Sequence, residues 1–144
     1  MDQWHRLVEI EKIKNLRSLF SHHFDSRDLD SLVGLFASDA VCEFPEEFGG
    51  NWRGQAEIRT RFRSYLDSYH RDWSTIHAIT NHVVTLEGHD RAVGTCYLLD
   101  YLVEQQESPL YAIAVFDDVY VRLDHQWLIQ RMRIQFHWRA GSPQ

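Results

Sequence analysis

Side chains that can bind a metal or move a proton gather in two short segments of the sequence. The first is SHHFDSRD at 21–28, which holds Asp25 after two histidines, and the second is TIHAITN at 75–81, which holds His77. A metal site is not expected from them, because adjacent residues of a helix point in different directions and the chain has no H-x-x-x-H or C-x-x-C spacing.

Taken singly, these residues have ordinary structural interpretations. The run Asp-Ser-Arg-Asp at 25–28 is common turn and cap chemistry. A lone histidine such as His77 is more often a hydrogen-bonded structural residue than a catalytic base. Cys42 and Cys96 lie in apolar runs without a basic neighbour, which is typical of reduced, buried thiols and favours a cytoplasmic location.

The bulk composition predicts one folded domain that spans residues 1–144. Hydrophobic residues make up 44% and aromatic residues 13% of the chain, as is typical of a globular protein. A net charge of −6 would repel nucleic acid and anionic membranes, so the expected partner is a small molecule. The N-terminal MDQWHRLVEIEKIK contains no continuous apolar stretch, so we expect neither a signal peptide nor a membrane span.

Apolar periodicity predicts helices in the first half of the chain. A long amphipathic helix is expected over 4–24, a short second helix capped by Asp28 and ended by Asp39, and a third helix over 55–69. Between the last two, a strand at 41–44 and turn residues at 49–51 predict an exposed hairpin.

Strand signals dominate after Trp73, where turn residues separate four antiparallel strands at about 75–87, 91–105, 110–123 and 126–138. Helices first and strands last indicate an α+β domain with the helices on one face of a bent sheet. Alternation places Cys96, Leu98, Asp100 and Leu102 on one face of the second strand, but the pattern does not say which face is inward.

Four segments carry a resemblance to a known family. They are EIEKIKNLRSLFSHHFDSRDLDSLVGLFASDAVCEF, TIHAITN, AVGTCYLLDYLV and DVYVRLDHQWLIQRMRI. Together they resemble the SnoaL-like, scytalone dehydratase-like branch of the nuclear transport factor 2 (NTF2-like) superfamily over nearly the whole chain. The resemblance implies a cone in which three N-terminal helices cover the concave face of a strongly bent antiparallel sheet. It also implies no metal, no cofactor and, in many members, a trimer.

Asp25 and His77 match the aspartate and histidine that form the catalytic pair of the dehydratase relatives. A neutral imidazole with a pKa near 6.5 accepts a proton at working pH, and a carboxylate bonded to its other nitrogen fixes the tautomer and stabilises the cation. Asp100 matches a carboxylate of the bile acid dehydratase relative. In an apolar pocket such a carboxyl can keep its proton and donate to a leaving group or an enolate oxygen. It can equally be an interface or strand-end group bonded to an arginine such as Arg133.

Departures from the relatives make the expected pocket more apolar. Phe20, Phe24 and Phe44 stand where the relatives tend to carry tyrosines, and Leu102 replaces a second pocket histidine. The expected substrate-binding residues are Asp100, Phe20, Phe24, Phe44, Trp52, Leu98, Leu102, Phe116 and Phe136. Because the expected acid for an expelled hydroxyl is missing, a hydrophobic or halogenated substrate, or one in which only a double bond shifts, is favoured.

The leading hypothesis is a cofactor-independent lyase, a dehydratase or dehydrohalogenase, in which His77 removes a proton and Asp25 orients the imidazole. A ketosteroid-isomerase-type isomerase and a non-catalytic small-ligand-binding protein are the alternatives. The sheet face opposite the helices carries Tyr97, Leu99, Tyr101, Ile113 and Val115. We expect a homo-oligomer to bury that face, with a trimer as the first choice and a dimer as the second.

Overall fold

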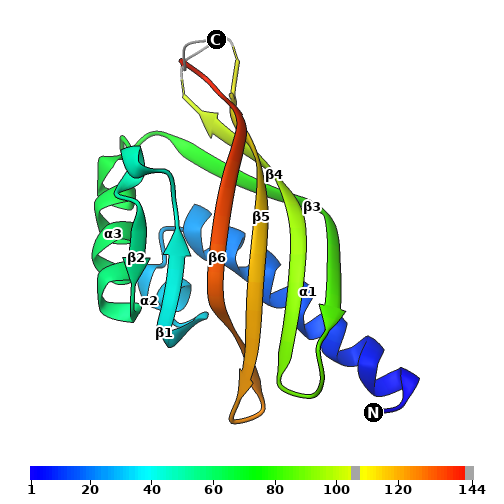
Figure 1. Ribbon diagram of the computed structural model, residues 1–144. Helices are drawn as coiled ribbons and strands as arrows, with labels where there is room; N and C mark the ends of the chain where they lie inside the picture. The colour runs from blue at the N-terminus through cyan, green and yellow to red at the C-terminus, as the bar shows by residue number, and fades with distance from the viewer. Residues whose placement is uncertain (105–107, 142–144) are drawn as a thin grey trace.

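One curved sheet of six strands, open at both edges, is the framework of the molecule (Figure 1). The computed structural model describes residues 1–104 and 108–141. The strands follow the order β2-β1-β6-β5-β4-β3 along the sheet, and the helices precede the long strands in the chain. The predicted α+β class, with a bent sheet and three N-terminal helices, is therefore confirmed.

Four long strands form an antiparallel meander close to the predicted boundaries. They are β3 (Ser74–Leu86), β4 (Arg91–Val103), β5 (Leu110–Leu123) and β6 (Gln126–Arg139). The predicted end of the second strand at 105 lies outside the described residues. The β3–β4 register shifts between Thr80 and Val83, where Asn81 has a φ of 54°. Such irregularities bend a sheet and give this one its concave face.

A short hairpin extends the meander beyond β6. Its elements are β1 (Phe36–Glu43), the 3₁₀ helix η1 (Glu46–Phe48) and β2 (Asn51–Arg53), and they are followed by α3 (Gln55–Ser68). β1 pairs antiparallel with β2 and parallel with β6. The hairpin was expected, but its predicted exposure is wrong, because Cys42 and Trp52 are fully buried. The Trp52 ring packs against Phe62 of α3, which covers this part of the sheet.

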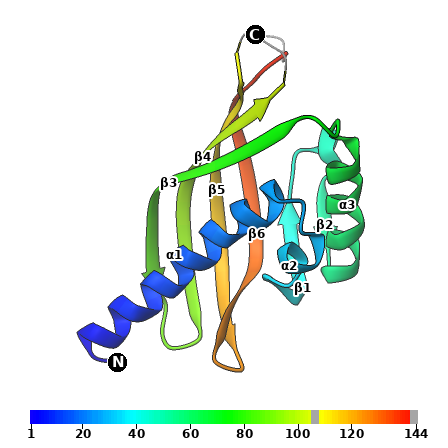
Figure 2. The same ribbon diagram turned by 180° about the vertical axis from the view of Figure 1, so that it is seen from behind.

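α1 (Gln3–Asp25) crosses the concave face of the sheet, as Figure 2 shows. α2 (Leu29–Val33) begins after Asp28, which caps it as predicted by accepting from the Ser31 backbone N–H. The prediction that Asp39 ends this helix is wrong. The helix ends at Gly34 because the apolar residues that follow enter β1, where Phe36 pairs with Ile129 of β6.

A buried ion pair links α1 to the inner face of the sheet. Arg17 Nε lies 3.2 Å from Asp118 Oδ2, and both side chains are fully buried. The Arg17 guanidinium also stands 3.6 Å from the centroid of the Phe116 ring. A charged pair therefore lies directly behind one of the predicted pocket residues.

Candidate active site

Asp25 and His77 form a hydrogen-bonded pair between the C-terminal end of α1 and the start of β3. Asp25 Oδ1 lies 2.6 Å from His77 Nδ1, and Asp25 Oδ2 accepts from the backbone N–H of His77 at 3.0 Å. The Thr75 hydroxyl donates to Asp25 Oδ1 at 2.9 Å. Because an ionised carboxylate only accepts hydrogen bonds, the contact between Asp25 Oδ1 and His77 Nδ1 favours a proton on Nδ1 and leaves Nε2 as the acceptor.

Local backbone geometry sets this pair in place. α1 ends at Asp25, and Arg27 then takes a left-handed conformation with a φ of 59°. The last turn of α1 also supplies Phe24, whose ring centroid lies 4.4 Å from that of His77. Thr75 and His77 are separated by one residue along β3 and so lie on the same face of the strand. The helix end and the strand thus hold the imidazole from two sides.

Asp100 lies directly across from His77 in the β3–β4 ladder. Its Oδ1 atom is 3.6 Å from His77 Nε2, which is beyond hydrogen-bond range. Burial raises the pKa of the Asp100 carboxyl; the His77 ring opposes this shift and the Asp25 carboxylate adds to it. An acceptor nitrogen and a carboxyl group whose pKa is raised by burial therefore face the same space.

That space is a small, mainly apolar cavity of about 80 Å³. The expected pocket residues that line it, besides His77, are Asp100, Phe20, Phe24, Phe44, Trp52, Leu98, Phe116 and Phe136. Leu102 is not among the lining residues, because it lies two residues beyond Asp100 on β4, opposite Thr75. The volume is below the roughly 150 Å³ of a cavity that holds benzene, so this shape suits a molecule with few heavy atoms.

Several lining residues were not anticipated from the sequence. They are Phe48, Phe62, Tyr65, Tyr69, Tyr111 and Ile134. A signal existed for Tyr65 and Tyr69, which lie on the apolar stripe of the predicted third helix. Nothing in the strand pattern of β5 singled out Tyr111. The site therefore gains phenol groups from the end of α3 and from β5, although Phe20 and Phe24 of α1, and Phe44 just after β1, stand where the relatives tend to carry tyrosines.

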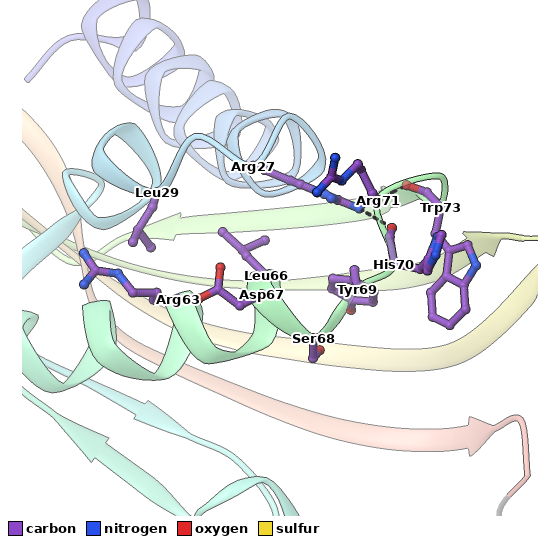
Figure 3. A pocket seen from close by; sticks show the side chains of 10 residues that line it. All are labelled: Arg27, Leu29, Arg63, Leu66, Asp67, Ser68, Tyr69, His70, Arg71 and Trp73. Atoms are coloured by element: carbon purple, nitrogen blue, oxygen red, sulfur yellow. Dashed lines mark hydrogen bonds between the residues drawn. The ribbon is translucent and has the colours of Figure 1, made fainter.

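A wider, open groove of about 910 Å³ adjoins the cavity, between the α1–α2 turn and the end of α3 (Figure 3). Its basic side chains are those of Arg27, Arg63, His70 and Arg71. Arg27 Nη2 donates to the main-chain carbonyls of His70 and Trp73 at 3.0 and 3.1 Å. Tyr69 lines both spaces and so forms part of the wall between them.

In residues 1–104 and 108–141, no group of three or more His, Cys, Asp or Glu side chains is arranged to hold a metal ion. In the same part of the chain, no helix is both long and apolar enough to cross a membrane. His22 and His23, which precede Asp25 on α1, do not line the inner cavity.

The sequence also matches a known family over most of its length. The model of the SnoaL-like domain aligns with residues 5–133. The chain belongs to the SnoaL-like domain family. No curated protein matches this SnoaL-like chain in sequence. The resemblance stated from the four segments is thereby confirmed.

Solved structures share the fold of this SnoaL-like domain. A candidate scytalone dehydratase from Novosphingobium aromaticivorans has a TM-score of 0.83 at 18% identity, covering 96% of this chain and 91% of the other. A hexachlorocyclohexane dehydrochlorinase from Novosphingobium barchaimii has a TM-score of 0.80 at 23% identity, covering 98% and 97%. A protein of unknown function from Mycobacterium tuberculosis has a TM-score of 0.79 at 23% identity, covering 96% and 78%. At these identities the likeness shows the NTF2-like fold alone.

Proposed function

We propose that this SnoaL-like domain is a cofactor-independent lyase that removes a proton from a small hydrophobic organic substrate. The observation that carries the proposal is the 2.6 Å contact between Asp25 Oδ1 and His77 Nδ1, beside an apolar cavity that His77 also lines. Dehydratase and dehydrochlorinase chemistry is attributed to structures of the same fold. Dehydration and dehydrohalogenation are accordingly the two forms of the proposed reaction.

The chemistry begins at His77 Nε2, which takes a proton from a substrate carbon. The electrons of the C–H bond form the new C=C bond, and the leaving group departs from the adjacent carbon with its electron pair. Asp25 stabilises the imidazolium through the Nδ1 proton. The phenylalanine walls keep water away from the reacting carbon. A positioned base of this kind contributes about 10²–10⁴ in rate.

An isomerase of the ketosteroid type is the second candidate, and Asp100 is the observation that favours it. Its buried carboxyl, with a raised pKa, lies 3.6 Å from His77 Nε2. A protonated carboxyl supports an enolate oxygen by donating a hydrogen bond, while the base returns its proton to another carbon. No leaving group is needed in that reaction.

Three small ketones test these alternatives. Deuterium incorporation into butan-2-one in D₂O, followed by ¹H NMR, reports proton removal alone. Formation of butenone from 4-hydroxybutan-2-one or from 4-chlorobutan-2-one reports loss of water or of chloride. The lyase proposal expects enzyme-dependent butenone formation that His77→Gln reduces by about 10²-fold or more. Exchange without elimination would favour the isomerase. Equal rates for the wild type and His77→Gln, including no reaction in either, would favour a non-catalytic binding protein.

We further propose that the sheet face opposite α1 is buried in a homo-oligomer, a trimer first and a dimer second. Tyr97 is 48% exposed there, and Leu99, Tyr101, Ile113 and Val115 are partly exposed. Leaving such a face in water is costly. A monomeric mass by light scattering would contradict this. The cytoplasm is the proposed location, because the free, buried thiols of Cys42 and Cys96 suit a reducing compartment.

A further inference from the structure

The cavity has two chemically different parts. Its inner walls are hydrocarbon, formed by residues such as Phe20, Phe62 and Phe116. The polar groups on its lining are His77, Asp100, Tyr65, Tyr69 and Tyr111. The first of these is the proposed base, and the other four are donors when protonated. A cavity lined in this way discriminates between substrates by what it offers to a substrate oxygen.

Tyr69 is the phenol best placed to act together with the His77 and Asp100 pair. It caps the C-terminal end of α3, and its ring centroid lies 6.3 Å from that of Phe24, which itself contacts His77. Within the described part of the chain, no hydrogen bond occupies its hydroxyl. Burial raises the pKa of the Tyr69 phenol most, and the nearby groups of Asp100 and then Tyr111 raise it further. The group therefore stays protonated and available as a donor.

Tyr65 and Tyr111 are less suited to that role. Burial raises the pKa of Tyr65 to about 12, and the next contributions come from Tyr111, Arg139 and Glu47 rather than from Asp100. Tyr111 is 37% exposed, so water competes for its hydroxyl. Tyr69 also lines both the cavity and the outer groove, so its side chain lies where the two spaces meet.

We propose that Tyr69 is a further catalytic residue, which donates a hydrogen bond to a carbonyl oxygen of the substrate while His77 removes a proton from the adjacent carbon. This rests on the proposed function and narrows its substrate class to small, otherwise apolar carbonyl compounds. In the step, the C–H electron pair forms the C=C bond of an enolate, and the carbonyl π electrons move onto the oxygen held by Tyr69. The proton resides on His77 Nε2, and the phenol keeps its own proton. A halogenated hydrocarbon would leave this donor without an acceptor.

Binding without turnover tests the Tyr69 assignment independently of His77 chemistry. The probes are fluoroacetone and 3-fluoro-2-methylpropene, two molecules of the same small size that differ by a carbonyl oxygen in place of a methylene group, and ¹⁹F NMR titration gives the dissociation constant of each. We expect the wild type to bind fluoroacetone more tightly than 3-fluoro-2-methylpropene, and we expect Tyr69→Phe to reduce this preference by about 3- to 10-fold, which is the usual contribution of one hydrogen bond. Affinity for 3-fluoro-2-methylpropene should not fall in Tyr69→Phe, because the ring that packs on Phe24 is kept. Tyr97→Phe, on the opposite face of the sheet, is the matched control and should behave as wild type.

Three results would overturn the assignment. They are failure of the wild type to bind either probe, equal affinity for the two, or a preference that survives in Tyr69→Phe.

A second experiment measures activity as deuterium exchange into butan-2-one. Tyr69→Phe should lower kcat for this exchange by about 10²–10³-fold, as removal of other single oxyanion donors does. If His77→Gln abolishes exchange and Tyr69→Phe does not slow it, the Tyr69 role fails while the proposed base stands. If Tyr69→Phe loses the probe preference but His77→Gln leaves exchange unchanged, the proposed base fails instead.

Discussion

Asp25 contacts His77 at two points. One carboxylate oxygen lies 2.6 Å from Nδ1 of the ring, and the other accepts from the main-chain N–H of the same residue at 3.0 Å. The first contact fixes the tautomer, and the second fixes the strand that carries the ring. The proton-accepting Nε2 is consequently directed toward Asp100, which lines the same cavity.

Replacing Asp25 by Asn should lower kcat for deuterium exchange into butan-2-one by between about 10²- and 10⁴-fold, because an amide neither fixes the tautomer nor stabilises the imidazolium. Thr75→Val is the matched variant. It removes one hydrogen bond to Asp25 at 2.9 Å but leaves the charge, so its effect should be about 10-fold or less. If Thr75→Val were as damaging as Asp25→Asn, orientation rather than charge would be the main contribution of the carboxylate.

Arg27 should control the order of the segment that carries Tyr69. Its guanidinium donates hydrogen bonds to the carbonyls of His70 and Trp73, while its backbone takes a left-handed conformation with a φ of 59°. Arg27→Ala should speed amide hydrogen exchange over 69–73 while leaving β5 unchanged. Arg27→Gly should do the same to the segment yet be more stable than Arg27→Ala by about 1–2 kcal/mol, because the left-handed conformation costs alanine roughly that much and costs glycine little. Unchanged exchange at 69–73 in both variants would show that the clamp is not needed.

The buried pair of Arg17 and Asp118 should be costly to break from one side. Arg17→Met leaves an uncompensated buried carboxylate, and we expect a loss of about 3–5 kcal/mol in the free energy of unfolding, measured by urea denaturation. Arg17→Met combined with Asp118→Asn should recover much of that loss, since the amide oxygen can still accept from the Tyr120 hydroxyl. A double variant as unstable as Arg17→Met would mean that lost packing on Phe116, rather than the stranded charge, causes the effect.

His82 should make the protein less stable in mild acid. Burial, followed by the charges of Arg17 and Lys14, lowers the pKa of His82 from 6.5 to about 4. Between pH 6.5 and 4 the unfolded chain binds this proton and the folded chain does not, so the contribution is fully present above pH 6.5 and is lost as pH falls toward 4. It should amount to about 2 kcal/mol, allowing for the partial exposure of the ring. His82→Gln should flatten urea-denaturation stability over this window relative to wild type, and an unchanged pH dependence would contradict the assignment.

Local patterning predicts the elements of this fold well where one periodicity dominates. The apolar stripe of α1 and the alternation along β4 and β5 depend on neighbouring residues, which the sequence displays directly. The error at α2 arose because Leu35 and Phe36 continue an apolar helical pattern while belonging to a strand that pairs with β6. The error at Trp52 arose because three residues of strand give no sign that α3 will cover them.

The residues of the candidate site likewise include some that the sequence predicts and others that only the tertiary structure brings together. Asp25, His77 and Asp100 were expected from motif resemblance, and the structure brings these three side chains close together. Tyr69, at the end of α3, and Tyr111, on β5, line the same cavity only because of the tertiary arrangement, which has no local pattern in the sequence. Leu102 shares the parity of Asp100 but lies too far along β4 to line the cavity, because parity fixes the face of a strand and not the depth along it.

The most direct test of the central claim compares deuterium incorporation into butan-2-one by the wild type and by His77→Gln in D₂O, at matched folded concentrations. His77 as the base predicts enzyme-dependent incorporation at the carbons next to the carbonyl, and a fall of about 10²-fold or more in the variant. Incorporation at the same rate in both proteins, or no incorporation above buffer in the wild type, would contradict proton abstraction by the Asp25–His77 pair.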